Sequence, residues 1–333
     1  MTRGARIVGR AGVVLAAAAL LAVRGDARVD VPRADREAVT EPAVRAHMEM
    51  LAGDAMNGRE SGSRDEWVAA TYVASQLRHW GLEPLGDAGG FVRTIELESG
   101  RTWNVMAILR GRDPRRASEV VMLSAHLDNL GVHGTREDRI YNGADDDASG
   151  VTGVLEIAHA LAARRRAPRS VLFVWFGSEE RGGLGVKDFI AHPPVPLTSI
   201  VASLGLEMIG RPNPDLPPRT VWLTGYERTT LGPALAAHGA RLVADPYPSQ
   251  RFFERSDNLS LARRGVIAQT ISTFGLQPEY HSPSDDLAHI DFAHLTATIQ
   301  SLIAPIEWLS HSSFTPAWQE GQRPEVDSRE SSK

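Results

Sequence analysis

The chain has 333 residues, of which 42% are hydrophobic and 23% are charged, an ordinary balance for a globular protein with a full core. Its formal net charge of -5 excludes a strongly basic surface, so nucleic acid is not an expected partner. The sequence contains no cysteine, which excludes disulfides and thiolate metal sites. Any metal ion must therefore be held by histidine and carboxylate side chains.

Residues 1–27 are typical of an export signal. Three arginines in the first ten residues form a positively charged start, residues 11–23 are an uninterrupted apolar run, and residues 25–27 provide a candidate cleavage site. The apolar run is shorter than the about 20 residues of a membrane-spanning helix. We therefore expect a cleaved signal peptide and an exported protein, periplasmic or extracellular. The alternative is an uncleaved segment that anchors the chain to a membrane.

The next part of the chain is predicted to be a linker followed by two helices. Residues 28–40 are charged and contain proline, as linkers do. A helical pattern begins at residue 41, a glycine-rich loop spans residues 53–63, and a second helix ends near Gly81. Only a short segment separates this helix from Trp103, so no inserted domain fits there.

Strands and helices then alternate. The predicted strands are short apolar runs at residues 104–109, 120–125, 170–176, 200–206, 221–224 and 266–271. The predicted helices, with apolar residues at helical spacing, are residues 151–166, 184–191 and 287–309. This alternation favours an α/β fold, a three-layer sandwich whose mostly parallel, mixed sheet is flanked by helices. We expect one domain over residues 41–312 and a disordered tail, rich in proline, glutamate and serine, over residues 313–333.

Three adjacent carboxylates, Asp145, Asp146 and Asp147, lie between an Asn-Gly turn and the helical pattern that begins at Val151. If they are buried, each must find a hydrogen-bond donor, a proton or a cation. Taken alone, the triplet would be a solvated turn that ends in a helix N-cap. Other polar residues, far away in the sequence, could lie close to the triplet in the folded chain, and they favour a binding site over a simple turn.

Polar side chains follow three of the predicted strands. His126 comes directly after one strand, Glu179 and Glu180 follow a second, and Glu207 follows a third. Ligands of parallel sheets bind beyond the carboxyl ends of the strands. Each of these residues is a weak signal alone, but together they predict a site at one edge of the sheet.

The combined pattern resembles peptidase family M28, the dinuclear zinc aminopeptidases. The resemblance covers most of the chain after residue 50. The segments that carry it are MLAGDAMNGRESGS (50–63), Asn104-Val105, AHLDNLG (125–131), YNGADDDASGV (141–151), FGSEERGGLG (176–185), LEMIGR (206–211), RSDN (255–258) and YHSPSDD (280–286).

The resemblance implies five metal ligands and two zinc ions, with another divalent metal as the alternative. His126 and Glu207 would hold one ion, Glu180 and His281 the other, and Asp146 would bridge both. Two dications a few ångströms apart repel each other, and a bridging carboxylate screens that repulsion. Many relatives carry Asp where Glu207 stands, but Glu also occurs in the family. The resemblance also implies a cis peptide bond between Asp146 and Asp147.

Three further residues receive roles from the resemblance. Glu179 would be the general base that activates the water shared by the two metals and then protonates the leaving amine. Asp128 would accept the second ring N–H of a metal-binding histidine or otherwise orient the site. Tyr280 would donate its hydroxyl to the oxyanion, and the alternative is a tyrosine that only packs beside the site.

The implied function is that of an exported zinc aminopeptidase whose partner is a peptide substrate. A related carboxypeptidase and a glutaminyl-cyclase-like acyltransferase remain open, because they share the fold and much of the ligand set. A non-catalytic receptor or scaffold domain of the same fold is the alternative from another class. Relatives of that last kind have typically lost ligands, whereas this chain keeps the full set.

Overall fold

The computed structural model describes residue 1 and residues 39–98, 100–135 and 137–325. The expected export signal and nearly all of the expected linker lie outside these residues. Within the described part of the chain, no helix has the length and apolar character that crossing a bilayer requires.

A nine-stranded mixed sheet is the centre of the fold. The strand order is β1-β3-β7-β4-β8-β11-β9-β10, and β2 pairs with β3. The strands of this sheet are β1 (Glu83–Pro84), β2 (Val92–Leu97), β3 (Gly100–Leu109), β4 (Val120–His126), β7 (Ser170–Phe176), β8 (Ile200–Leu206), β9 (Val221–Leu223), β10 (Leu242–Ala244) and β11 (Ala268–Ser272). The four central strands β7, β4, β8 and β11 are parallel, and β3 is antiparallel to β7. A small hairpin, β5 (Gly131–Val132) with β6 (Ile140–Tyr141), lies apart from this sheet.

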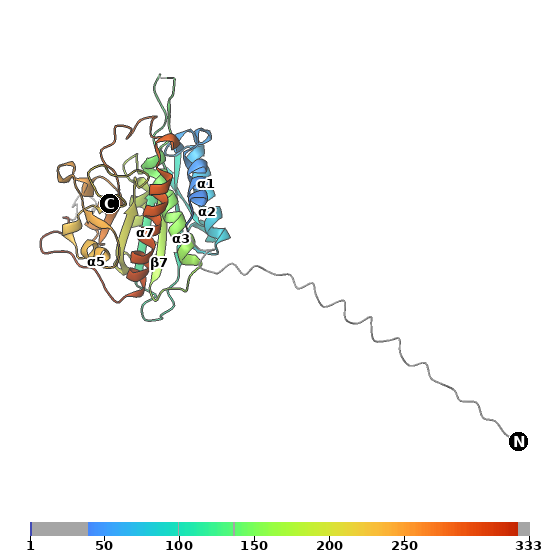
Figure 1. Ribbon diagram of the computed structural model, residues 1–333, viewed down its shortest axis with the longest axis vertical. Helices are drawn as coiled ribbons and strands as arrows, with labels where there is room; N and C mark the ends of the chain where they lie inside the picture. The colour runs from blue at the N-terminus through green and yellow to red at the C-terminus, as the bar shows by residue number, and fades with distance from the viewer. Residues whose placement is uncertain (2–38, 99, 136, 326–333) are drawn as a thin grey trace. The chain divides into compact units, whose positions relative to one another are not determined.

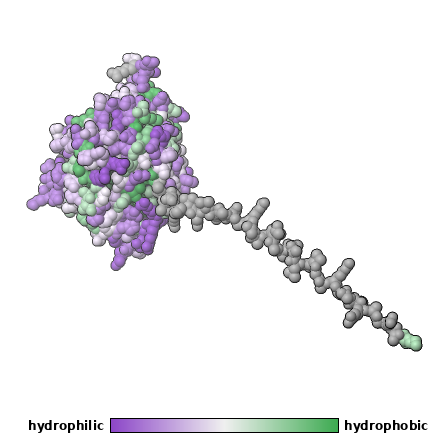
Figure 2. Space-filling view, viewed as in Figure 1, coloured by the Kyte–Doolittle hydropathy of each residue, from purple (hydrophilic) through white to green (hydrophobic). Residues whose placement is uncertain are grey.

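Helices cover both faces of the sheet, which confirms the predicted three-layer α/β fold (Figure 1). The helices are α1 (Glu41–Ala52), α2 (Arg64–His79), α3 (Gly150–Ala162), α4 (Leu184–Ala191), α5 (Leu231–Ala237), α6 (Asn258–Arg263) and α7 (Phe292–His311). Along β7, Phe173 and Trp175 pack into a core with α1, α2, α3 and α7, whereas Leu172 and Val174 pack into a second core with α4 and α6. Every residue of β4 and β7 is buried, as continuous apolar runs in a covered parallel sheet require. The outer surface in the same view is mostly hydrophilic (Figure 2).

Several element boundaries follow from capping. Ser63 accepts hydrogen bonds from the backbone amides of Asp65 and Glu66 and so starts α2. The long C-terminal helix begins at Phe292 rather than at residue 287, because the Asp291 side chain caps it and residues 287–289 form a separate 3₁₀ turn. Likewise, α3 ends at Ala162, earlier than predicted.

The residues after 312 differ from the expected disordered tail as far as residue 325. The main-chain oxygen of Phe314 accepts a hydrogen bond from Arg169, Thr230 N donates to the oxygen of Ala317, and Trp318 packs against the core. The two aromatic side chains supply the apolar contact area that composition alone did not indicate. The domain therefore extends beyond residue 312.

Candidate metal centre

The carboxyl ends of three adjacent parallel strands carry the predicted site. In the sheet β4 lies between β7 and β8, so His126 at the end of β4 is close to Glu179 and Glu180 after β7 and to Glu207 after β8. His281 reaches the same edge from the loop between β11 and α7. All of these residues therefore lie at the carboxyl edge of the sheet, which is where ligands of parallel sheets bind.

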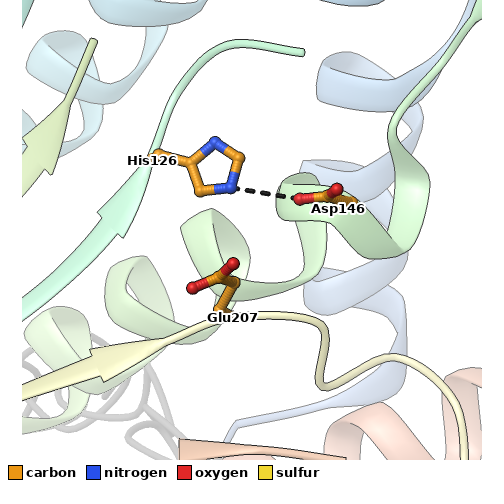
Figure 3. Close-up of side chains that lie close together, drawn as sticks. All are labelled: His126, Asp146 and Glu207. Carbon is orange, nitrogen blue, oxygen red and sulfur yellow. Dashed lines mark hydrogen bonds and ion pairs between the residues drawn. The ribbon is translucent and has the colours of Figure 1, made fainter. Parts of the chain in front are cut away.

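Two groups of potential ligands share one carboxylate. The first contains His126, Asp146 and Glu207, and the second contains Asp146, Glu180 and His281. Within each group, one potential ligand atom from every residue lies within 4.8 Å of the others. In Figure 3 the side chains of the first group point toward one another from the end of β4, the turn before α3 and the end of β8.

The two oxygens of Asp146 face different groups. Oδ1 is 3.1 Å from Nε2 of His126, and Oδ2 is 3.2 Å from Nε2 of His281. The same nitrogen of His281 is 3.1 Å from Oε1 of Glu180. This is the arrangement that a bridging carboxylate between two cations needs. The peptide bond between Asp146 and Asp147 is cis, as the resemblance implied.

Asp147 ties the ligand-bearing segments together. Its carboxylate accepts hydrogen bonds from the backbone amides of His126 at 3.1 Å, Gly150 at 3.0 Å and Met208 at 3.3 Å. These amides belong to the end of β4, the first turn of α3 and the segment after Glu207. The helix-capping interpretation of the acidic triplet therefore describes Asp147, whereas Asp146 faces the two histidines.

Asp285 is a site residue to which the sequence assigned no role. Its two carboxylate oxygens accept the backbone amides of Asp145 at 2.9 Å and Asp146 at 3.0 Å. Arg211 donates to Oδ1 of Asp285 at 3.3 Å. The motif YHSPSDD contained Asp285, but the two amides that its carboxylate accepts lie about 140 positions away, and spacing cannot reveal such contacts.

Asp128 organises the glutamate pair. Its carboxylate accepts the backbone amides of Glu179 at 3.0 Å and Glu180 at 3.3 Å, and it receives a hydrogen bond from Ser61. Nδ1 of His126 lies 3.1 Å from the main-chain oxygen of Asp128 and 3.8 Å from its Oδ1. The histidine ring is therefore oriented by the main chain of Asp128, and the carboxylate orients the glutamates.

The electrostatics of the site favour a bound cation. Burial raises the pKa of Glu179 well above its usual value, and it raises the pKa of Glu180 and Glu207 as well. Burial alone would lower the pKa of both histidines, but nearby carboxylates outweigh it. The carboxylates of Asp146 and Glu180 raise the pKa of His281 to about 10. A site that holds protons this firmly attracts positive charge, and a metal ion would compete with those protons.

Backbone strain is concentrated beside the expected ligands. Ser178, Met208 and His281 have φ values of 53°, 52° and 53°, in the left-handed region that non-glycine residues rarely adopt. Such conformations cost on the order of 1–3 kcal/mol each and persist where the surroundings enforce them. The surrounding fold therefore fixes the backbone that carries Glu179, Glu207 and His281.

Tyr280 lines a pocket beside the metal-binding groups. The lining of this pocket includes Glu207, Met208, Trp222, Phe252, Phe274 and Tyr280. The ring of Tyr280 stacks on His281 with a centroid distance of 3.8 Å. Burial raises the pKa of Tyr280, so its hydroxyl keeps its proton at neutral pH. The tyrosine therefore packs beside the site with a proton available to donate.

Comparison with known proteins identifies similar sequences. The family model described as Peptidase family M28 matches residues 104–305. Leupeptin-inactivating enzyme 1 of Streptomyces exfoliatus is 32% identical over 212 residues, which cover 60% of this chain and 44% of that protein. A probable leucine aminopeptidase of Trichophyton verrucosum is 22% identical over 285 residues, 78% of this chain and 70% of that protein. This chain thus spans less than half of the length of the Streptomyces relative.

Solved structures share the fold. A zinc aminopeptidase from Bacillus subtilis superposes with a TM-score of 0.65 at 13% sequence identity, covering 83% of this chain and 97% of the other. LapA aminopeptidase from Legionella pneumophila has a TM-score of 0.62 at 18% identity, with 82% and 73% of the two chains covered. The three-layer architecture is therefore common to these proteins.

Proposed function

Because this chain belongs to peptidase family M28, we propose that it is a zinc-dependent aminopeptidase that removes N-terminal residues from peptides. One observation carries the proposal: two groups of potential metal ligands share Asp146, and the buried carboxylate of Glu179 interacts with His126, Glu207 and Glu180 without belonging to either group. The names of the relatives and of the structural neighbours support the same activity.

We assign two zinc ions to the two groups. His126 and Glu207 would hold one ion, Glu180 and His281 the other, and Asp146 would contribute one oxygen to each. Imidazole and carboxylate donors suit zinc, and the three carboxylates offset most of the charge of two dications. Zinc ions, when bound, supply Lewis-acid polarisation of the substrate carbonyl and make the attacking water more acidic.

The side chains beside these two groups would transfer protons and donate hydrogen bonds during the reaction. Glu179 would take a proton from the attacking water and deliver it to the leaving amine, and its raised pKa lets it hold that proton between the two steps. Tyr280, which keeps its hydroxyl proton, would donate it as a hydrogen bond to the oxyanion. Asp128 would hold the backbone of Glu179 and Glu180 in place.

The surroundings of the site favour a free N-terminus over a free C-terminus as the group recognised. The carboxylates of Asp146, Glu179, Glu180 and Glu207 surround His126, and a carboxylate that the metal ions leave free would attract an ammonium group and repel a terminal carboxylate. The aromatic pocket beside Glu207 would accept a large apolar side chain. The acidic side chains favour an aminopeptidase over a carboxypeptidase, whereas the pocket concerns only the side chain of the residue that is removed. The complete pair of metal-binding groups argues against a single-zinc cyclase and against a non-catalytic scaffold.

A panel of matched substrates tests the aminopeptidase activity. We expect leucine and phenylalanine anilides to be cleaved and their N-acetylated forms to lose about 100-fold in kcat/KM. That loss corresponds to about 2.7 kcal/mol, the order of one hydrogen bond to a charged group. A chelator should abolish cleavage of all of them. Equal cleavage of free and blocked substrates would contradict the aminopeptidase assignment but not the hydrolase assignment.

The substitution Asp128→Asn tests the proposed role of Asp128. An asparagine offers one acceptor oxygen and one NH₂ group, so one of the two glutamate amides would face a donor. We expect kcat/KM to fall about 10- to 100-fold with zinc retained, the usual effect of losing a group that orients metal ligands. Ser61→Ala, which removes only a donor to Asp128, is the control and should cost less. Wild-type kinetics in Asp128→Asn would refute the role.

We also propose that the protein acts outside the cytoplasm. The support is the sequence pattern of residues 1–27, with its positively charged start, apolar run and candidate cleavage site.

A further inference from the structure

Arg59 is a fully buried cation whose hydrogen bonds all go to main-chain oxygens. Its side chain is 0% exposed. Nε donates to Leu127 at 2.9 Å, Nη1 donates to Leu51 and, at 2.7 Å, to Asn142, and Nη2 donates to Gly143 at 2.9 Å. Four carbonyls from three separate segments therefore meet on one guanidinium group.

Two of these segments carry expected metal ligands. Leu127 directly follows His126, and Gly143 lies three positions before Asp146. The third segment is the last turn of α1, which contains Leu51. Arg59 therefore links the strand end that presents His126 to the turn that presents Asp146, and it anchors both to a helix of the outer layer.

The backbone around Arg59 strengthens this link. Asn57, Gly58 and Arg59 have φ values of 45°, 67° and 45°, all in the left-handed region. A Cβ atom at Gly58 would lie 2.2 Å from the main-chain oxygen of Tyr141, so the turn can pack against β6 only as glycine. The main-chain oxygen of Arg59 also accepts the amide of Asn129 at 3.3 Å. The strained turn is thus held against both ligand-bearing segments.

The charge of Arg59 is balanced by the site and not by a direct ion pair. Among the described residues, its hydrogen-bond acceptors are all main-chain oxygens, and the nearby carboxylates act on it only through longer-range attraction. Burial lowers the pKa of Arg59, and the surrounding carboxylates of Asp128, Asp285, Asp147 and Asp146 oppose that effect. Burying a charged group without a compensating charge costs free energy. The negative charge of the nearby carboxylates therefore stabilises the buried guanidinium of Arg59.

We propose that Arg59 is a positioning residue for the metal centre, which holds the His126 segment and the Asp146 segment at the separation that metal binding requires. The inference rests on the proposed metal site, and it concerns the geometry of that site rather than its chemistry. The side-chain hydrogen bonds of Arg59 go to main-chain oxygens and not to the side chain of any implied metal ligand.

Arg169 provides a matched control at the opposite edge of the sheet. It is 1% exposed, donates to the main-chain oxygens of Leu309 at 3.0 Å and Phe314 at 2.6 Å, and lies directly before the start of β7. Unlike Arg59 it also forms an ion pair, with Glu119 at 2.6 Å. It is therefore a second buried arginine that holds main-chain carbonyls, but it is remote from His126 and Asp146.

The test compares Arg59→Lys with Arg169→Lys. A lysine concentrates its donors on one nitrogen, so it cannot reach carbonyls spread over three segments. Zinc affinity is measured by competition with a chelator, site geometry by the visible spectrum of the cobalt-loaded protein, and stability by the Tm of the metal-free protein. We expect Arg59→Lys to weaken zinc binding about 10- to 100-fold and to change the cobalt spectrum. Arg169→Lys should lower Tm but leave zinc affinity within about twofold of wild type.

Each other outcome is decisive. Wild-type zinc affinity and an unchanged cobalt spectrum in Arg59→Lys would overturn the proposal. If neither Arg59→Lys nor Arg59→Gln folds while Arg169→Lys does, the proposal is also overturned, because Arg59 would then determine the fold and not the metal geometry. Absence of zinc binding in the wild-type protein would instead contradict the proposed function, so the two failures are distinguishable.

Discussion

The substitution Glu179→Gln is expected to lower kcat by about 1000-fold while the protein keeps both zinc ions. Glutamine has nearly the same volume as glutamate but cannot accept a proton, and general-base groups typically contribute 10²- to 10⁴-fold. Glu179 belongs to neither group of potential metal ligands, so its loss leaves the donors intact. Steady-state kinetics and metal analysis of the purified variant measure both effects.

The neighbouring residue supplies the control. Glu180→Gln makes the same chemical change one position later, but it removes a carboxylate that lies 3.1 Å from His281. We expect this variant to lose zinc affinity as well as activity, and to regain part of its activity at high zinc concentration. Full turnover in Glu179→Gln would exclude Glu179 as the base, whichever way Glu180→Gln behaves.

The substitution Asp146→Asn is expected to weaken zinc binding at both positions by more than about 100-fold. Asp146 is the only residue common to the two groups, and its two oxygens face His126 and His281 separately. An asparagine leaves one neutral oxygen and turns an NH₂ group toward the other ion. Equilibrium dialysis with zinc measures the loss, and activity should fall in parallel.

The same substitution at the adjacent Asp145 is the control for this experiment. Its Oδ1 accepts a hydrogen bond from the amide of Gly210 at 2.7 Å and one from Ser149 at 3.2 Å, and an asparagine oxygen can still accept them. Asp145→Asn should therefore keep both zinc ions. Retention of two ions in Asp146→Asn, or equal losses in the two variants, would contradict the bridging role.

The central strands and the ligand set were predictable from sequence because their signals are local. β4, β7 and β8 are continuous apolar runs, and a polar residue follows each of them at the strand end. That pattern predicted a site at one edge of the sheet, and the resemblance to family M28 implied which residues would be ligands, including Asp146 and His281. The structure brings the five implied ligands into the two groups.

Other parts of the fold lacked such a signal. β2 lies outside the central sheet path and mixes charged with apolar residues, so most of its positions are only half-buried and no apolar run marks it. The segment after residue 312 has the composition of a disordered tail, but Phe314 and Trp318 pack against the core. A few large side chains outweighed the average composition.

The residues that position the site were the hardest to recognise. Arg59 occurs in a glycine-rich loop, where a solvated arginine is the ordinary expectation, and Asp285 accepts main-chain amides far away in the chain. The resemblance implied an orienting role for Asp128, but not its hydrogen bonds to the amides of Glu179 and Glu180. A main-chain amide or carbonyl can belong to a residue of almost any type, so the spacing of residue types does not reveal which main-chain group a side chain contacts. Only the folded arrangement of the loops shows these contacts.

A calorimetric titration of the metal-free protein with zinc tests the central claim most directly. We predict two equivalents bound per chain, with protons released on binding. His281 is protonated in the metal-free protein because its pKa is raised from 6.5 to about 10, so zinc must displace that proton. Apparent zinc affinity should therefore rise about tenfold per pH unit, for each proton displaced, between pH 6.5 and 10. Absence of saturable binding, or an affinity that does not change with pH, would contradict the account.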